Sequence, residues 1–97
     1  MDLDRPRRRA DIVLRDLGPD AMLYDPVGDR VVRLNSTSRR IWQLCDGEHD
    51  LAAIAATIAG EFRTPPSADV PEDVAATVRA FGAAQLLARS QPRTQRV

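Results

Sequence analysis

Three short runs in the first third of the chain have the apolar and polar spacing of β-strands. They cover residues 11–17 (DIVLRDL), 21–24 and 31–34. Gly-Pro follows the first run and Asp-Pro the second, and such pairs mark turns. The pattern predicts three strands joined by short connections.

The third run is expected to bury one of its two faces. Val32 and Leu34 fall on one side of it, and Val31 and Arg33 fall on the other, as the two-residue period of a strand requires. The residues before it, DPVGDR, combine Pro, Gly and two Asp, which is a hairpin signal. We therefore expect the third strand to pair with the second and to bury one side of the sheet.

A helix is predicted directly after the third strand, with almost no loop. Asn35 and Ser36 offer side-chain oxygens that cap a helix start, and apolar residues recur at helical spacing up to Cys45. Gly47 can take the left-handed conformation that ends a helix. The first helix is expected over about residues 36–45.

Two further helices are predicted in the second half of the chain. Asp50 can cap the second, whose apolar positions follow the three-four rhythm up to Phe62. The prolines at 65 and 66 indicate a connector. The third helix is expected to start near Pro71, with acidic residues in its first turn, where the helix dipole favours them.

Three strands followed by three helices predict an α+β fold that is winged helix-turn-helix-like, with a three-stranded antiparallel sheet preceding the helices. A chain of 97 residues fits one domain, which we place at residues 11–89. The Arg-rich residues 1–10 and the polar residues 90–97 are predicted to be disordered tails, with docking of the basic tail to an acidic partner as the minority interpretation.

Composition limits the classes of partner. Fourteen basic residues balance fourteen acidic ones, so the chain has no overall field that would draw it to nucleic acid or to an anionic membrane. A single Cys cannot form an internal disulfide, and no apolar run is long enough to span a bilayer. We expect a cytoplasmic protein without nucleic-acid or membrane partners.

Catalytic chemistry has little support in the residues. His49 lies between acidic residues in a turn, and nothing near it supplies a nucleophile. Cys45 lies at a helix C-terminus, which raises rather than lowers a thiol pKa, and reads as a small buried residue. One His and one Cys do not make a metal site, and there is no Gly-rich phosphate loop. The sequence predicts a protein that is not an enzyme and needs no metal or cofactor.

An ordered set of motifs carries a family resemblance. The chain contains, in this order, Leu34-Asn35, a polar turn, Ile41-Trp42, Asp46-Gly47, Ile54-Ala55, and then Val74, Val78 and Phe81. This set, over about residues 12–87, resembles the PqqD family, also known as the RiPP recognition element. The family usually has a Gly-Leu pair after the last helix, where this chain has Gln85-Leu86-Leu87, so we expect either a looser closing turn or a wider groove.

The resemblance implies a non-catalytic domain that binds the leader segment of a ribosomally made precursor peptide and presents it to a modifying enzyme. In that family the leader adds as a strand to the free edge of the third strand and sets its side chains against the third helix. Carried over position by position, the peptide-binding residues are Arg30, Val31, Val32, Arg33 and Leu34 on the strand and Val74, Ala75, Val78 and Arg79 on the helix.

The residues themselves leave plainer interpretations open. Phe81 and Trp42 are more readily explained as core residues than as contacts. Arg33 and Arg79 are solvated charges by default, although an acidic leader would make them its natural partners. An unpaired strand edge can also pair with itself, so the protein is expected to be a monomer or a homodimer.

Two other functions compete with the leader-binding hypothesis. A winged-helix DNA-binding regulator has the same architecture, but the second helix, DLAAIAATIAGEF, lacks the Arg, Lys, Asn or Gln side chains of a recognition helix. A homodimeric interaction module is a third, weaker option. Within the leader-binding hypothesis, the form IWQLCDG favours a radical-SAM partner enzyme over a lasso-peptide system with a protease partner.

Overall fold

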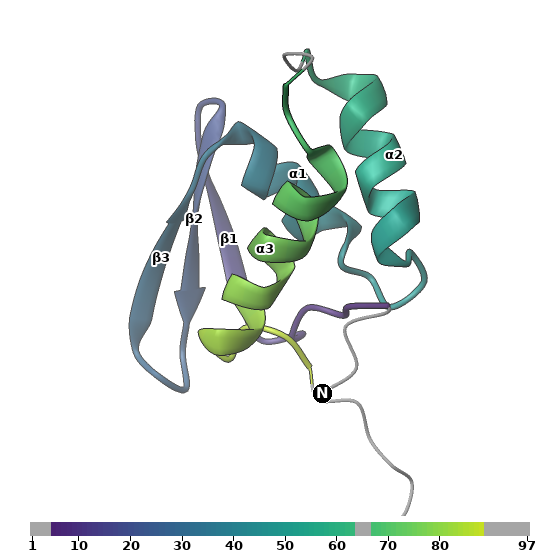
Figure 1. Ribbon diagram of the computed structural model, residues 1–97. Helices are drawn as coiled ribbons and strands as arrows, with labels where there is room; N and C mark the ends of the chain where they lie inside the picture. Colours follow the sequence, from purple (N-terminus) through teal and green to yellow (C-terminus); the bar gives the residue numbers. More distant parts are fainter. Residues whose placement is uncertain (1–4, 64–66, 89–97) are drawn as a thin grey trace, which may run out of the picture.

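The computed structural model describes residues 5–63 and 67–88, which form a three-stranded sheet followed by three helices (Figure 1). This confirms the predicted α+β fold class. The predicted connector at residues 65–66 and the predicted tail over 90–97 lie outside the described residues. In chain order the elements are β1 (Val13–Leu17), β2 (Asp20–Asp25), β3 (Arg30–Leu34), α1 (Ser36–Leu44), α2 (Leu51–Glu61) and α3 (Val70–Ala83).

The sheet is antiparallel with strand order β1-β2-β3, so β2 is central and β3 is an edge strand. Leu14 lies opposite Leu23, which in turn lies opposite Val32. These cross-strand neighbours share the inner face, and Leu23 is fully buried there. The alternation seen in the sequence therefore sets the register, because a slip of one residue would turn the apolar side outward.

Each helix starts with a side-chain cap, and the sequence predicted those of α1 and α2. Asn35 Oδ1 accepts a hydrogen bond from the Ser38 backbone N–H at 2.8 Å, and Asp50 Oδ1 accepts one from Ala53 at 2.8 Å. Asp69 does the same for α3. Helix α1 ends at Leu44 with Cys45 as its cap residue, within one residue of the predicted end, and Gly47 takes the expected left-handed conformation, φ 84°.

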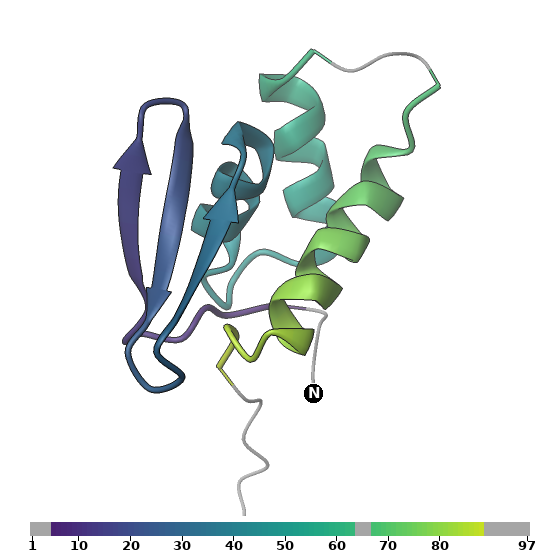
Figure 2. The same ribbon diagram turned by 90° about the vertical axis from the view of Figure 1, so that its left-hand side faces the viewer.

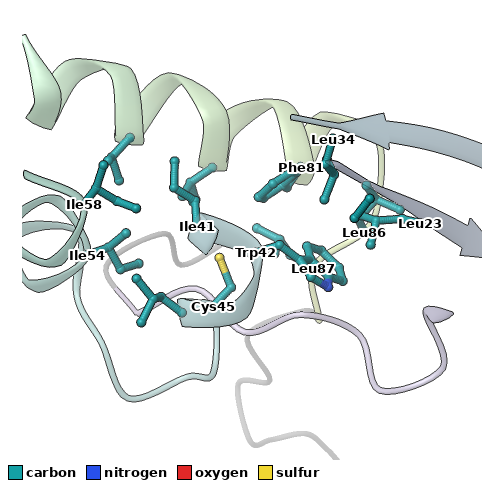
Figure 3. Packing of buried hydrophobic residues seen from close by; sticks show 14 of the residues in the cluster. Leu23, Leu34, Ile41, Trp42, Cys45, Ile54, Ile58, Phe81, Leu86 and Leu87 are labelled. Atoms are coloured by element: carbon teal, nitrogen blue, oxygen red, sulfur yellow. The ribbon is translucent and has the colours of Figure 1, made fainter. Parts of the chain in front are cut away.

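One aromatic pair stands at the centre of the core. The rings of Trp42 on α1 and Phe81 on α3 meet edge to face, with centroids 5.3 Å apart and planes at 84° (Figure 3). Both side chains are buried, which confirms their interpretation as core residues. The other buried apolar residues, from all three helices, the strands β2 and β3 and the final turn, are Ala21, Leu23, Leu34, Ile41, Leu44, Cys45, Ile54, Ala55, Ile58, Val74, Val78, Leu86 and Leu87.

The turn after α3 is closed by hydrogen bonds, so the expectation of a looser turn is wrong. Gln85 takes the left-handed conformation, φ 63°, that a glycine would provide. Its N–H donates to the Gly82 carbonyl at 3.0 Å, and Leu86 N–H donates to the Phe81 carbonyl at 2.9 Å. The two leucines that follow are buried, and their burial holds the turn in place.

The prediction of a disordered tail over residues 1–10 is wrong for residues 5–10. Arg8 N–H donates to the Cys45 carbonyl at 2.8 Å, and Arg9 N–H donates to the Leu86 carbonyl at 3.0 Å. The Arg8 guanidinium also donates to the Gln43 carbonyl at 2.9 Å, at the C-terminal end of α1. Cationic side chains are favourable at helix C-termini, and this segment places two of them where α1 and α3 end.

Candidate functional site

The free edge of β3 lies alongside α3 without contacting it through the backbone. The described residues of β3 and α3 contain no pair of Cα atoms within 8 Å of each other. Figures 1 and 2 show the two elements on the same side of the molecule, with α1 behind the upper part of β3. We call residues Arg30–Leu34 the β3 edge, and Val74, Ala75, Val78 and Arg79 the α3 wall.

Residues of the β3 edge divide between the two faces of the sheet. Leu34 is buried and Val32 is half-buried against the core, whereas Val31 and Arg33 point to the opposite face and are exposed. Arg33 contacts Asp20 across the strands at 3.6 Å. An incoming strand that paired with this edge would meet an apolar inner side next to Val32 and Leu34.

The α3 wall is accessible only in part. Val74 and Val78 are buried in the core, so their side chains offer little surface to a ligand. Ala75 is half-buried and Arg79 is exposed, and the Arg79 guanidinium donates to the Glu72 carboxylate at 2.8 Å. Ala75 and Arg79 therefore form the accessible part of the predicted wall.

Arg30 links the start of the β3 edge to the end of α3. Its guanidinium Nη2 donates to Asp25 Oδ2 at 3.2 Å and to the backbone carbonyl of Ala84, the cap residue of α3. The spacing between β3 and α3 is thus fixed at one end by a side chain that the sequence placed in the binding site.

Asp25 is the buried centre of this link. The backbone N–H of Gly28 and the guanidinium of Arg9 are the main groups that hold the pKa of Asp25 well below its usual range. The carboxylate accepts from the Gly28 and Val27 backbone N–H groups in the hairpin turn, at 3.1 and 3.0 Å. It also accepts from Arg30, so the whole cluster organises the lower end of the β3 edge.

Sequence reasoning missed Arg9, which completes the cluster. Its guanidinium binds both oxygens of Asp25 and also donates to the Gln85 carbonyl at 2.9 Å. One signal was available, because Asp25 falls on the inner face of β2, where an unpaired carboxylate would be costly. No local pattern distinguishes its partner among the fourteen arginines of the chain.

The two residues considered for catalysis, Cys45 and His49, are respectively buried and in contact with a carboxylate. Burial raises the pKa of the Cys45 thiol to about 12, so the nucleophilic thiolate is not formed at neutral pH. His49 Nδ1 lies 2.9 Å from both carboxylate oxygens of Asp46, and this contact is the main reason that the pKa of Asp46 is lowered. Residues 5–63 and 67–88 contain no group of three or more His, Cys, Asp or Glu placed to hold a metal ion.

None of the described helices combines the length and the apolar character that crossing a bilayer requires.

Comparisons with known proteins agree with this arrangement. Residues 20–87 match the family described as coenzyme PQQ synthesis protein D (PqqD). No protein of the curated set matches the chain. A solved structure described as TbiB1 in complex with the TbiA(beta) leader peptide has a similar fold, with a TM-score of 0.71 and 20% identity over 88% of this chain and 98% of that one.

Proposed function

This chain belongs to the PqqD family, and we propose that it binds the leader segment of a ribosomally made precursor peptide and presents it to a modifying enzyme without catalysing a reaction itself. The observation that carries the proposal is the free β3 edge beside α3. In the described residues, every Cα atom of β3 lies more than 8 Å from every Cα atom of α3. An edge strand offers unpaired N–H and C=O groups, and a peptide strand can complete them.

Energetic estimates support this mode of binding. Four or five main-chain hydrogen bonds contribute about 1 kcal/mol each. A few leader side chains buried against Val32 and Ala75 add about 1.5–3 kcal/mol each. After the cost of ordering a flexible peptide, micromolar or tighter affinity remains within reach. Such affinity is sufficient to recruit a substrate to an enzyme.

DNA binding is less well supported by the same structure. The exposed side of α2 consists of Ala52, Ala56, Ala59 and Gly60, which carry no group that reads base edges, and of the terminal Glu61, whose carboxylate accepts hydrogen bonds from Arg40. On α3, Arg79 is already paired with Glu72. We therefore place leader binding before a role as a winged-helix regulator.

The finer parts of the proposal concern the partner and the location. We propose a radical-SAM protein as the modifying enzyme, and a lasso-type system with a protease as the alternative. The cytoplasm is the natural location, since ribosomes supply the precursor there. The similar solved structure, a complex of TbiB1 with a leader peptide, supports peptide capture by this fold.

The deciding experiment is a titration of the ¹⁵N-labelled full chain with the leader half of the precursor peptide encoded nearest to its gene. We expect amide shifts in the β3 edge, Arg30–Leu34, and at Ala75 and Arg79. A duplex DNA titration at low salt is the parallel arm. Absence of shifts at high peptide concentration, or saturable DNA binding in their place, would overturn the proposal.

Strand addition itself is tested by methylating single backbone nitrogens of the leader. Residues of an added strand alternate between pairing with the β3 edge and facing away from it. Each methyl group that removes a pairing N–H is expected to weaken binding roughly five- to tenfold, because one hydrogen bond contributes about 1 kcal/mol. Methyl groups at the alternate positions serve as the matched control. A uniform effect along the peptide would contradict strand addition.

A further inference from the structure

The side of the sheet that faces away from the helices exposes large hydrophobic side chains. Figure 1 shows α1, α2 and α3 all on the opposite side of the sheet. Within the described residues, five large hydrophobic residues are exposed, and all five lie in the sheet or its hairpin turn. Eight residues make up what we call the outer face: Val13, Arg15, Leu17, Asp20, Met22, Tyr24, Val31 and Arg33.

The register arranges these residues in rows. Val13 lies opposite Tyr24, which lies opposite Val31, so one apolar row crosses all three strands. The three side chains are 45%, 37% and 57% exposed. The next row has Met22 between two arginines, Arg15 and Arg33. Clustered exposure of this kind, rimmed by charge, marks surfaces that bind other proteins.

The charge of the outer face is positive. Arg33 is partly balanced by Asp20, at 3.6 Å. Arg15 has no carboxylate within 4.0 Å among the described residues, and its neighbour Asp16 pairs with Arg39 instead, at 2.6 Å. A complementary surface is therefore apolar and carries carboxylates.

The outer face by itself is too small to hold a second copy of this chain in a stable dimer. Strands about 4.8 Å apart and about 3.4 Å per residue give the three-stranded face an extent on the order of 200 Å². A stable interface buries about 800 Å² on each partner. The occupant must therefore contact more than this face alone.

A bound leader would enlarge the same face. A strand added at the β3 edge becomes the fourth strand of the sheet, and its alternate side chains point to the side on which Val31 and Arg33 lie. The inner side chains of the leader would be hidden against α3. The outward ones would extend the row of Val13, Tyr24 and Val31.

We propose that the outer face and the outward side chains of the bound leader form one docking surface for the enzyme that modifies the peptide, through an apolar patch with carboxylates on that enzyme. This inference rests on the proposed function. It explains how a small protein can hold the peptide at the edge of the sheet and engage a second protein on the outer face. It also makes enzyme binding depend on the leader, because the leader supplies part of the surface.

The test measures two affinities separately. The full chain is titrated first with the leader peptide and then, with the leader bound, with the purified modifying enzyme encoded beside its gene. The first variant is Arg15→Glu, which reverses a charge of the outer face. The second combines Val13→Thr with Leu17→Thr, which makes the face more polar with a residue that is favourable in strands. For both variants we expect the affinity for the leader to stay unchanged and the affinity for the enzyme to fall at least tenfold. Arg15→Lys keeps the charge and should retain most of the affinity for the enzyme.

Arg63→Glu is the matched control, because it reverses one exposed charge beyond the C-terminal end of α2. It should leave both affinities unchanged. Enzyme affinity that survives the outer-face variants, or that is the same without leader, overturns the inference and leaves the proposed function intact. Loss of a dimer of the chain in those variants, seen by sedimentation, would also overturn it. Failure of the leader to bind the unaltered chain would remove the proposed function and the inference together.

Discussion

The guanidinium of Arg9 donates hydrogen bonds to both carboxylate oxygens of Asp25, at 3.2 and 3.1 Å, across 16 positions of sequence. Asp25 is buried, and it also receives the guanidinium of Arg30. The pair therefore connects the N-terminal segment to the hairpin that leads into the β3 edge. Through the carbonyls of Ala84 and Gln85, the two arginines extend the connection to the end of α3.

The first prediction concerns the stability of this cluster. Replacing Asp25 with Asn keeps the size of the side chain but removes the buried charge that the half-buried guanidinium of Arg9 and the more exposed one of Arg30 both bind. We expect Asp25→Asn to lower the melting temperature by several degrees, measured by circular dichroism. Glu48→Gln, which removes an exposed carboxylate, is the control and should have no effect. A double-mutant cycle with Arg9→Ala should show strong non-additivity, and additive effects would contradict the link.

A second prediction follows from the lowered pKa of Asp25. Because the folded-state pKa is below the unfolded value, the carboxylate stabilises the fold above the unfolded pKa, and this contribution is lost as the pH falls toward the folded value. We expect the free energy of unfolding, from urea titrations, to fall as the pH drops below about 4. Asp25→Asn should show a flatter dependence there. Parallel curves would contradict the assignment.

The N-terminal segment shows where sequence patterns stop being informative. The caps Asn35 and Asp50 act within three residues of their partners, so they could be predicted, as could the strand alternation. Arg8 and Arg9 instead bind groups 16 to 76 positions away. A run of arginines has no periodicity that separates a solvated tail from such a segment, and only the tertiary fold decides.

The strands beside the candidate site could be predicted for similar reasons, because the hairpin pairs β3 with β2 and leaves the other edge of β3 free. The burial of the α3 wall could not be predicted in the same way: Val74 and Val78 are buried, and Ala75 and Arg79 carry the accessible surface. The contact from Arg30 to α3 spans 54 positions, and no local pattern predicts it.

The third prediction uses the left-handed conformation of Gln85, φ 63°. A residue with a Cβ atom pays about 1–2 kcal/mol to adopt the left-handed conformation. Glycine avoids this cost but loses about 0.5–1 kcal/mol more backbone entropy than alanine when the chain folds. We expect Gln85→Gly to stabilise the fold by about 0.5–1 kcal/mol in urea unfolding. Gln85→Ala keeps the Cβ atom and should give no gain. An equal gain from both variants would show that the conformation is not the cause.

The last prediction tests which side of α3 the peptide uses. Ala75 and Ala76 are adjacent alanines on the same helix, the first half-buried and the second exposed. If Ala75 belongs to the part of the α3 wall that the leader contacts, a leucine in place of Ala75 fills the space that the leader side chains require. Ala75→Leu is then expected to weaken leader affinity at least tenfold in fluorescence anisotropy while the melting temperature stays the same.

Ala76→Leu is the matched control, because the same enlargement one residue further along points in a different direction on the helix. It should leave both the affinity and the melting temperature unchanged. The converse result for Ala75→Leu, a lower melting temperature with full leader affinity, would place this residue against α2 rather than beside the peptide. The wall would then be limited to Arg79, and because Arg79 is already paired with Glu72, the leader would be held almost entirely by the β3 edge.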